Sequence, residues 1–160
     1  MITAAPTKSN KAAISLFTVF LCLLACALYY YFFFNRAQVV IELEVEHPTV
    51  FKLYWSGDNQ KFSEKRSGQV RVLPRETTYS FSLTDISNVT FLRLDPVQYP
   101  GDSVVKSIVI SQTGFKDYSV DLSQAEPLHD IAEYEFDSDG LHVKATGKDP
   151  NFLMVPQLEK

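Results

Sequence analysis

The sequence predicts an all-β antiparallel sandwich, jelly-roll-like in architecture, preceded by a single N-terminal transmembrane α-helix. Two observations lead to this fold class. Residues 12–34 contain no charged side chain, whereas most of the chain after them alternates apolar and polar residues with the period of two that is typical of strands. Whole-chain averages of 46% hydrophobic residues, 21% charged residues and a net charge of −4 conceal this division.

The uncharged stretch AAISLFTVFLCLLACALYYYFFF, residues 12–34, is long enough for one membrane span. A helix of this length rises about 35 Å, against about 30 Å for the hydrocarbon core of a bilayer. A cleaved signal peptide is the alternative, but its apolar region has only about 7–15 residues and ends at small residues. Here the run ends in the bulky residues Tyr29–Phe34, which suit a membrane interface. We therefore expect an uncleaved anchor.

Charge predicts the orientation of this anchor. Lys8 and Lys11 precede the span, and just after it acidic residues outnumber the single Arg36. Because cytoplasmic flanks are enriched in Lys and Arg, the N-terminus is expected in the cytoplasm. The expected organisation is a disordered cytoplasmic tail at residues 1–11, a transmembrane helix at residues 12–34 and an exported β-sandwich domain at residues 37–160.

The exported domain is acidic and has no cysteine. Both cysteines, Cys22 and Cys26, lie in the span, so the domain must be stabilised by its core and not by disulfides. The domain holds all 19 acidic residues and all but Lys8 and Lys11 of the 15 basic ones, which gives it a net charge of −6. This charge argues against binding to nucleic acid and against docking on anionic lipid.

The strands are predicted in order from the alternation of apolar residues. Val39, Ile41 and Leu43 open the pattern, and their neighbours point to the opposite face. Similar runs predict strands over residues 39–45, 51–55, 70–72, 79–83, 89–95, 104–111, 115–120, 132–136 and 141–145. Gly and Pro turns separate most of them, and Asp139-Gly140 predicts a tight hairpin. Only residues 122–131 are expected to hold a short helical turn. This spacing indicates an antiparallel sandwich or barrel.

The sequence contains no arrangement typical of catalysis. His47, His129 and His142 show no metal-ligand spacing, and there is no nucleophile elbow, phosphate-binding glycine loop or Cys–His pair. The acidic residues between 130 and 139 lack the order of a calcium-binding loop, and a solvated strand edge is favoured over a cation site. We therefore expect no enzyme activity, no metal site and no cofactor.

Four residues are candidates for contacting a sugar. Arg93 and Asp95 lie on the same face of a strand, where the planar donors of arginine could clamp sugar hydroxyls. A structural pair that holds the strand end before a proline is the favoured alternative. Tyr54, on the polar face of its strand, and Tyr99, in a Pro-Gly loop, are expected to be exposed, whereas Trp55 falls on the apolar face and is expected in the core.

Short motifs give the chain a family resemblance. They are Phe51-x-Leu-Tyr-Trp55, Phe62-Ser-Glu64 with Ser67, Leu92-Arg-Leu-Asp-Pro96 with Gly101, Ser107-Ile-x-Ile110 and the closing Thr-Gly-Lys-Asp-Pro-Asn-Phe-Leu-Met-Val-Pro156. Over residues 39–156 the chain resembles a β-sandwich module attached to bacterial membrane proteins of surface-polysaccharide assembly, chiefly polytopic glycosyltransferases. The module is similar in architecture to jelly-roll carbohydrate-binding domains. This chain differs from the larger proteins in having one span and no transferase domain.

The resemblance implies a single-pass protein of the bacterial inner membrane with a periplasmic or extracellular domain. Its expected function is that of an accessory protein that binds a glycan or lipid-linked saccharide through Tyr54, Arg93, Asp95 and Tyr99. The alternative is a non-enzymatic structural subunit of a membrane protein complex that binds no glycan. The expected partners are the lipid bilayer, a glycan or polysaccharide, and a membrane glycosyltransferase or other integral membrane protein.

Overall fold

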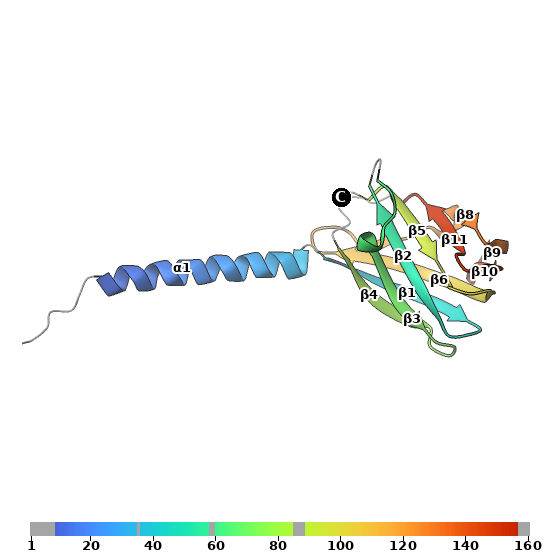
Figure 1. Cartoon of the computed structure of the whole chain (residues 1–160), viewed down its shortest axis with the longest axis horizontal. Helices are drawn as coiled ribbons and strands as arrows, with labels where there is room; N and C mark the ends of the chain where they lie inside the picture. The colour runs from blue at the N-terminus through green and yellow to red at the C-terminus, as the bar shows by residue number, and fades with distance from the viewer. Residues whose placement is uncertain (1–8, 35, 58–59, 85–88, 157–160) are drawn as a thin grey trace, which may run out of the picture.

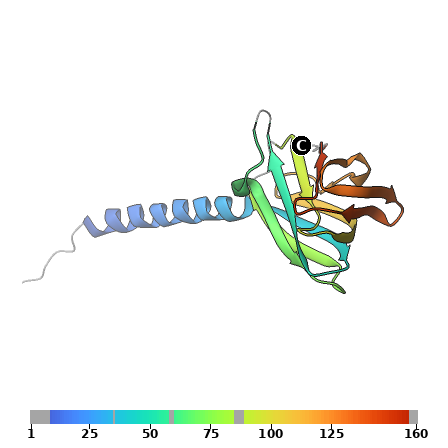
Figure 2. The same cartoon turned by 45° about the vertical axis from the view of Figure 1, so that its right-hand side comes forward.

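An apolar helix and a two-layered β-sandwich make up the computed structural model, which describes residues 9–34, 36–57, 60–84 and 89–156. The helix projects from one end of the sandwich (Figures 1 and 2). The predicted fold class, an antiparallel sandwich preceded by an N-terminal helix, is confirmed.

The helix α1 (Ser9–Tyr29) continues into a π-helical turn, η1 (Tyr30–Phe34). Its 22-residue segment Ala13–Phe34 has a mean hydropathy of 2.2 and no buried residue, so it is long and apolar enough to cross a membrane. The helix starts at Ser9, earlier than predicted, and residues 1–8 of the expected tail lie outside the described residues. In the final turns the ring of Tyr29 stacks on that of Phe33, with 4.9 Å between their centroids.

The described strands form two antiparallel sheets. Sheet A has the order β4 (Thr78–Thr84), β1 (Arg36–Val45), β6 (Gly101–Gln112), β10 (Gly140–Ala145) and β9 (Ile131–Asp137), and the short β7 (Tyr118–Ser119) also pairs with β6. Sheet B has the order β3 (Ser67–Val72), β2 (Thr49–Ser56), β5 (Phe91–Asp95), β11 (Asn151–Met154) and β8 (Glu126–His129). Two short 3-10 helices, η2 (Glu64–Arg66) and η3 (Leu122–Gln124), lie between strands.

Three strands differ from the sequence prediction. The strand expected over residues 115–120 is reduced to β7, whereas β8 and β11 were not expected. The helical turn expected within residues 122–131 is present as η3, but β8 begins after a single intervening residue, Ala125. Pro127 lies in β8. A proline argues against a strand in the sequence because it has no N–H group to donate a hydrogen bond to a neighbouring strand. It is tolerated here because β8 is the last strand of its sheet.

The core lies between the two sheets and follows from the alternation along each strand. In β1, the side chains of Ala37, Val39, Ile41 and Leu43 are all at most 1% exposed, and the residues between them face outward. Sheet B covers them with residues that include Phe51, Leu53, Leu94 and Phe152, all fully buried. Trp55 is 4% exposed within this core, as predicted from its position on the apolar face.

The helix is joined to the sandwich at the start of β1. Ala37, three positions after the end of η1, is already in the core. The side-chain amide of Gln112, at the end of β6, donates a hydrogen bond of 3.0 Å to the carbonyl oxygen of Phe34. The guanidinium of Arg36 lies 5.5 Å from the centre of the Phe32 ring. The end of the helix therefore contacts the two adjacent central strands of sheet A.

The predicted hairpin between β9 and β10 depends on Gly140. Its φ of +133° is strained for other residues, and a Cβ atom there would meet the backbone of the neighbouring β6, including Lys106 Cα at 2.8 Å. Gly114 also has a positive φ, of +90°, but a Cβ there would have open space. An alanine would therefore have a strained backbone at either position, but its Cβ atom would clash with neighbouring atoms only at position 140.

We expect Gly140→Ala to lower the free energy of unfolding by about 3–4 kcal/mol, because backbone strain and overpacking add. Gly114→Ala, the matched control, is expected to cost about 1 kcal/mol, from strain alone. Urea unfolding of the full chain in detergent, followed by tryptophan fluorescence, measures both. Equal losses for the two variants would contradict the proposed contact between Gly140 and β6.

Candidate functional site

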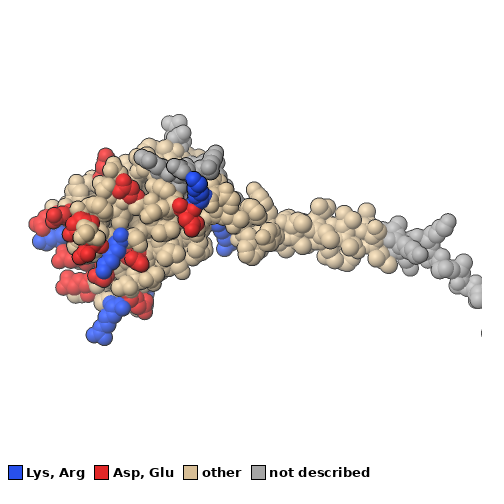
Figure 3. Space-filling view, turned by 180° about the vertical axis from the view of Figure 1, so that it is seen from behind, with Lys and Arg blue, Asp and Glu red and all other residues tan. Residues whose placement is uncertain are grey.

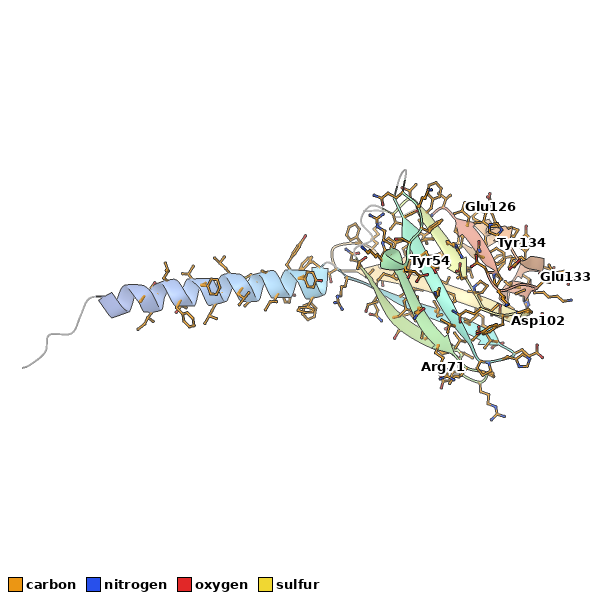
Figure 4. All side chains as sticks on the ribbon, viewed as in Figure 1. Tyr54, Arg71, Asp102, Glu126, Glu133 and Tyr134 are labelled. Carbon is orange, nitrogen blue, oxygen red and sulfur yellow. The ribbon has the colours of Figure 1, made fainter. Side chains whose placement is uncertain are left out.

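The residues singled out from the sequence meet on the outer face of sheet B. In the antiparallel pairing of β2 with β5, Tyr54 lies opposite Arg93, and Lys52 lies opposite Asp95. Because alternate residues of β2 fill the core, Lys52 and Tyr54 are directed to the outer face. Strand register thus gathers two cations, a carboxylate and an aromatic ring on one surface. Figure 4 shows Tyr54 on this face of the sandwich.

Arg93 is held by two carboxylates. Its Nε donates to Asp95 Oδ1 at 2.7 Å, and its Nη2 donates to Asp95 Oδ2 at 2.9 Å and to Asp149 Oδ1 at 2.6 Å. The Asp95 side chain is 9% exposed and that of Asp149 62%. The first contact is therefore a two-pronged, largely desolvated pair, and the second is a surface ion pair.

Burial acts on both members of the Arg93–Asp95 pair. It raises the pKa of the Asp95 carboxyl by more than the Arg93 hydrogen bonds and charge lower it. Burial also lowers the pKa of Arg93, but the hydrogen bond and charge of Asp95, together with the charges of Asp149 and Tyr54, raise it overall. The raised pKa of Arg93 favours its charged form, whereas the raised pKa of Asp95 favours its neutral form. Because both hydrogen bonds are short and aligned, the ionised pair is the form that the geometry supports.

Tyr54 is buried under this ion pair. Its ring centre lies 5.1 Å from the Arg93 guanidinium carbon and 5.9 Å from Lys52 Nζ, and its hydroxyl donates to Glu64 Oε1 at 2.7 Å. Burial, followed by the Glu64 hydrogen bond, raises the pKa of Tyr54, and the same bond lowers the pKa of Glu64. Only 7% of Tyr54 is exposed. The expectation of an exposed Tyr54 is wrong, because these neighbours cover the ring.

Tyr99 lies apart from this cluster. It is 61% exposed, in the turn before β6. It lines a hollow of about 100 Å³ together with residues from the turn between β1 and β2, among them His47 and Pro48. In the described part of the chain, no hydrogen bond or ring contact joins Tyr99 to Arg93, Asp95 or Tyr54. Of the four candidates, the fold brings three together and leaves Tyr99 separate.

Sequence reasoning missed three members of the cluster. Lys52 and Glu64 pair with each other at 3.5 Å beside Tyr54, and Asp149 reaches Arg93 from the loop before β11. Glu64 and Asp149 both lie in motifs that carry the family resemblance, which is the one signal that pointed to them. Arg93 and Asp149 are 56 positions apart, so no spacing rule relates them.

The cluster connects segments of sheet B. Through paired side chains it links β2, β5, the short helix η2 and the loop before β11. Two of the three guanidinium nitrogens of Arg93, Nε and Nη2, donate to carboxylates. Among the described residues, no three His, Cys, Asp or Glu side chains are grouped so that they could hold a metal ion. The contacts favour the structural interpretation of the Arg93–Asp95 pair.

No family model matches the sequence, and no curated protein matches it either. Among solved structures, the chain is similar to a crystal structure of Delta413-417:GS LOX, with a TM-score of 0.42 and 11% identity. Two point variants of that protein give TM-scores of 0.43 and 0.40, with 11% and 12% identity. Each superposition covers 76% of this chain and 16% of the LOX chain.

The two carboxylates on Arg93 are expected to differ in their effect on stability. Asp95→Ala removes a desolvated, two-pronged partner and is expected to lower the free energy of unfolding by about 2–3 kcal/mol. Asp149→Ala removes an exposed partner of the same guanidinium and is expected to cost less than about 1 kcal/mol. Urea unfolding at neutral pH measures both variants. A loss for Asp149→Ala as large as that for Asp95→Ala would show that burial does not set the strength of these contacts.

Proposed function

We propose that the protein is a single-pass, membrane-anchored, non-enzymatic subunit of a membrane protein complex, located in the bacterial inner membrane. One observation carries this proposal: the apolar helix leads directly into the sandwich. Phe34 ends the helix, Ala37 is in the core, and Gln112 binds the last helical carbonyl group. The helix is exposed along its whole apolar length, so its surface is available to lipid and to the helices of a partner.

A direct junction suits a subunit better than a tethered binding module. A module that searches for ligand benefits from a flexible linker. Here β1, which lies between β4 and β6 in sheet A, begins at Arg36, next to the helix. A partner that holds the helix would therefore also constrain the position of the sandwich above the membrane.

The proposed orientation has the N-terminus in the cytoplasm and the sandwich in the periplasm or outside the cell. Lys8 and Lys11 on the N-terminal side support it through the positive-inside tendency. Acidic side chains gather at the end of the sandwich remote from the helix (Figure 3). Anionic lipid repels such a surface, so this charge distribution favours a domain that points away from the bilayer.

Glycan binding in surface-polysaccharide assembly is the second candidate function, with a membrane glycosyltransferase as the expected partner. The observation that favours it is the exposed ring of Tyr99 beside the hollow at His47 and Pro48. Exposed aromatic rings present an apolar face on which a sugar ring can stack. Arg93 and Asp95 support this function less than Tyr99 does, because two carboxylates already bind the Nε and Nη2 atoms of Arg93.

Cysteine labelling tests the orientation, because the sandwich contains no cysteine. Glu133→Cys places a thiol at an exposed position of β9, and Thr3→Cys places one before the span. In spheroplasts, a membrane-impermeant maleimide is expected to label the first variant and to label the second only after lysis. The unmodified chain is the control for Cys22 and Cys26. Labelling of Thr3→Cys in intact spheroplasts would reverse the proposed orientation.

Native mass spectrometry of the full chain, purified in mild detergent, tests the function itself. A stoichiometric integral membrane partner is the expected result. A bound saccharide without a protein partner would favour glycan binding, and its loss in Tyr99→Ala but not in Tyr54→Phe would locate the contact. A bare monomer would contradict the proposed subunit role.

A further inference from the structure

The sandwich is closed at one edge and open at the other. At the closed edge β3 packs against β4, and Gly68 leaves room for the side chains of Phe81 and Leu83. At the other edge, β9 ends sheet A and β8 ends sheet B. All four residues of β8 and residues 132–137 of β9 are exposed. Two strand edges therefore lie side by side without cover from the described chain.

The backbone groups at the free edge can be assigned from the hairpin. The bridge between Asp137 and Gly140, separated by two turn residues, is a hydrogen-bonded pair. Hydrogen-bonded and non-bonded pairs alternate along an antiparallel ladder. Tyr134 and Phe136 are consequently at non-bonded positions, where their N–H and C=O groups face away from β10. These groups are available to a further strand.

The two faces of β9 differ sharply in chemistry. Tyr134 and Phe136 lie on the inner face, and the Tyr134 ring meets the core residue Phe152 edge-on, with 5.8 Å between centroids. Nevertheless, Tyr134 is 50% exposed and Phe136 48%, because the edge is open. An exposed pair of aromatic residues next to unpaired backbone is typical of an interaction surface.

The outer face of β9 carries Glu133, Glu135 and Asp137. Lys144 pairs with Glu133 at 3.6 Å and His142 with Asp137 at 3.2 Å, and no ion pair reaches Glu135 in the part of the chain that the structure describes. Glu133 and Glu135 also line a hollow of about 400 Å³ on sheet A, with Asp102 at its far side. Figure 4 shows Asp102, Glu133 and Tyr134 at this end of the molecule.

We propose that the free edge of β9 binds an extended segment of a partner protein in which basic and apolar residues alternate. Such a segment would add a strand to sheet A by β-augmentation. Its backbone would pair with Tyr134 and Phe136, its apolar side chains would cover their rings, and its basic side chains would lie beside Glu133, Glu135 and Asp137. This inference rests on the proposed subunit role and specifies the surface of contact.

A second copy of the chain does not fit this edge. Suppose that the β9 strands of two chains pair antiparallel with Tyr134 and Phe136 of both chains on the same face of the sheet. Even-numbered residues of one strand then lie opposite even-numbered residues of the other. Odd-numbered residues then oppose odd-numbered ones, so Glu133, Glu135 and Asp137 of one chain would face the same acidic residues of the other. Like charges directly opposite each other destabilise a sheet. Charge therefore selects a basic partner segment.

The test uses the full chain in nanodiscs of phosphatidylcholine and a fluorescent peptide, Lys-Val-Lys-Val-Lys-Val-Lys. We expect fluorescence anisotropy to detect saturable binding. Hydrogen exchange should show new protection of the Tyr134 and Phe136 amides, whereas the Glu135 amide, already bonded to β10, should change little. Glu135→Lys is expected to weaken binding at least tenfold. Glu42→Lys makes the same charge change at an exposed position of β1, away from the edge, and is expected to change binding less than twofold.

A peptide of the same sequence with N-methylated valines is the matched ligand control, since it keeps the charge and lacks the valine N–H donors that would face β9. Its failure to bind supports strand addition. Equal binding of the methylated peptide, equal weakening by Glu42→Lys, or no binding of the parent peptide would each overturn the inference. If a stoichiometric membrane partner co-purifies with the wild-type chain and equally with Glu135→Lys, the subunit role stands and the β9 contact fails.

Discussion

Burial of apolar side chains between the two sheets is the constraint on which the rest of the structure depends. The sandwich has no cysteine, and hydrophobic burial provides the main favourable free energy of folding. Because a strand presents alternate residues to opposite faces, placing Val39 and Ile41 of β1 in the core also determines which residues face solvent. The outer cluster around Arg93 and the acidic face of β9 are therefore consequences of the same register that fills the core.

Much of the fold could be predicted from the sequence because its two periodicities are clear. The uncharged run predicted the helix, and alternation predicted the strands that have long apolar patterns, such as β1 and β6. Alternation failed for β8, where Pro127 interrupts the pattern, and for β11, which has only four residues. β8 is the edge strand of sheet B and none of its residues is buried, so its pattern is weak. β11 is mostly buried, but four residues are too few to show an alternation.

The candidate site was predicted only in part. Alternation placed Tyr54, Arg93 and Asp95 on outward-facing positions, and register brought them together. It could not show what covers an outward-facing side chain, so the burial of Tyr54 under Arg93 was missed. The ion pair with Asp149 depends on how a distant loop returns to β5. Faces of strands follow from local sequence, whereas contacts between loops and strands depend on the completed topology.

The position of β6 sets a requirement on the size of any partner. Its last residue, Gln112, binds the end of the helix. Near its first residue, Asp102 lies opposite Lys144 of β10, the strand next to β9. A strand of 12 residues measures about 40 Å, and the β9 edge lies at the end of the molecule far from the helix (Figures 1 and 2). A protein confined to the bilayer could grip the helix but could not touch β9. Engagement of both surfaces by one molecule would require an extramembrane part about as tall as this sandwich.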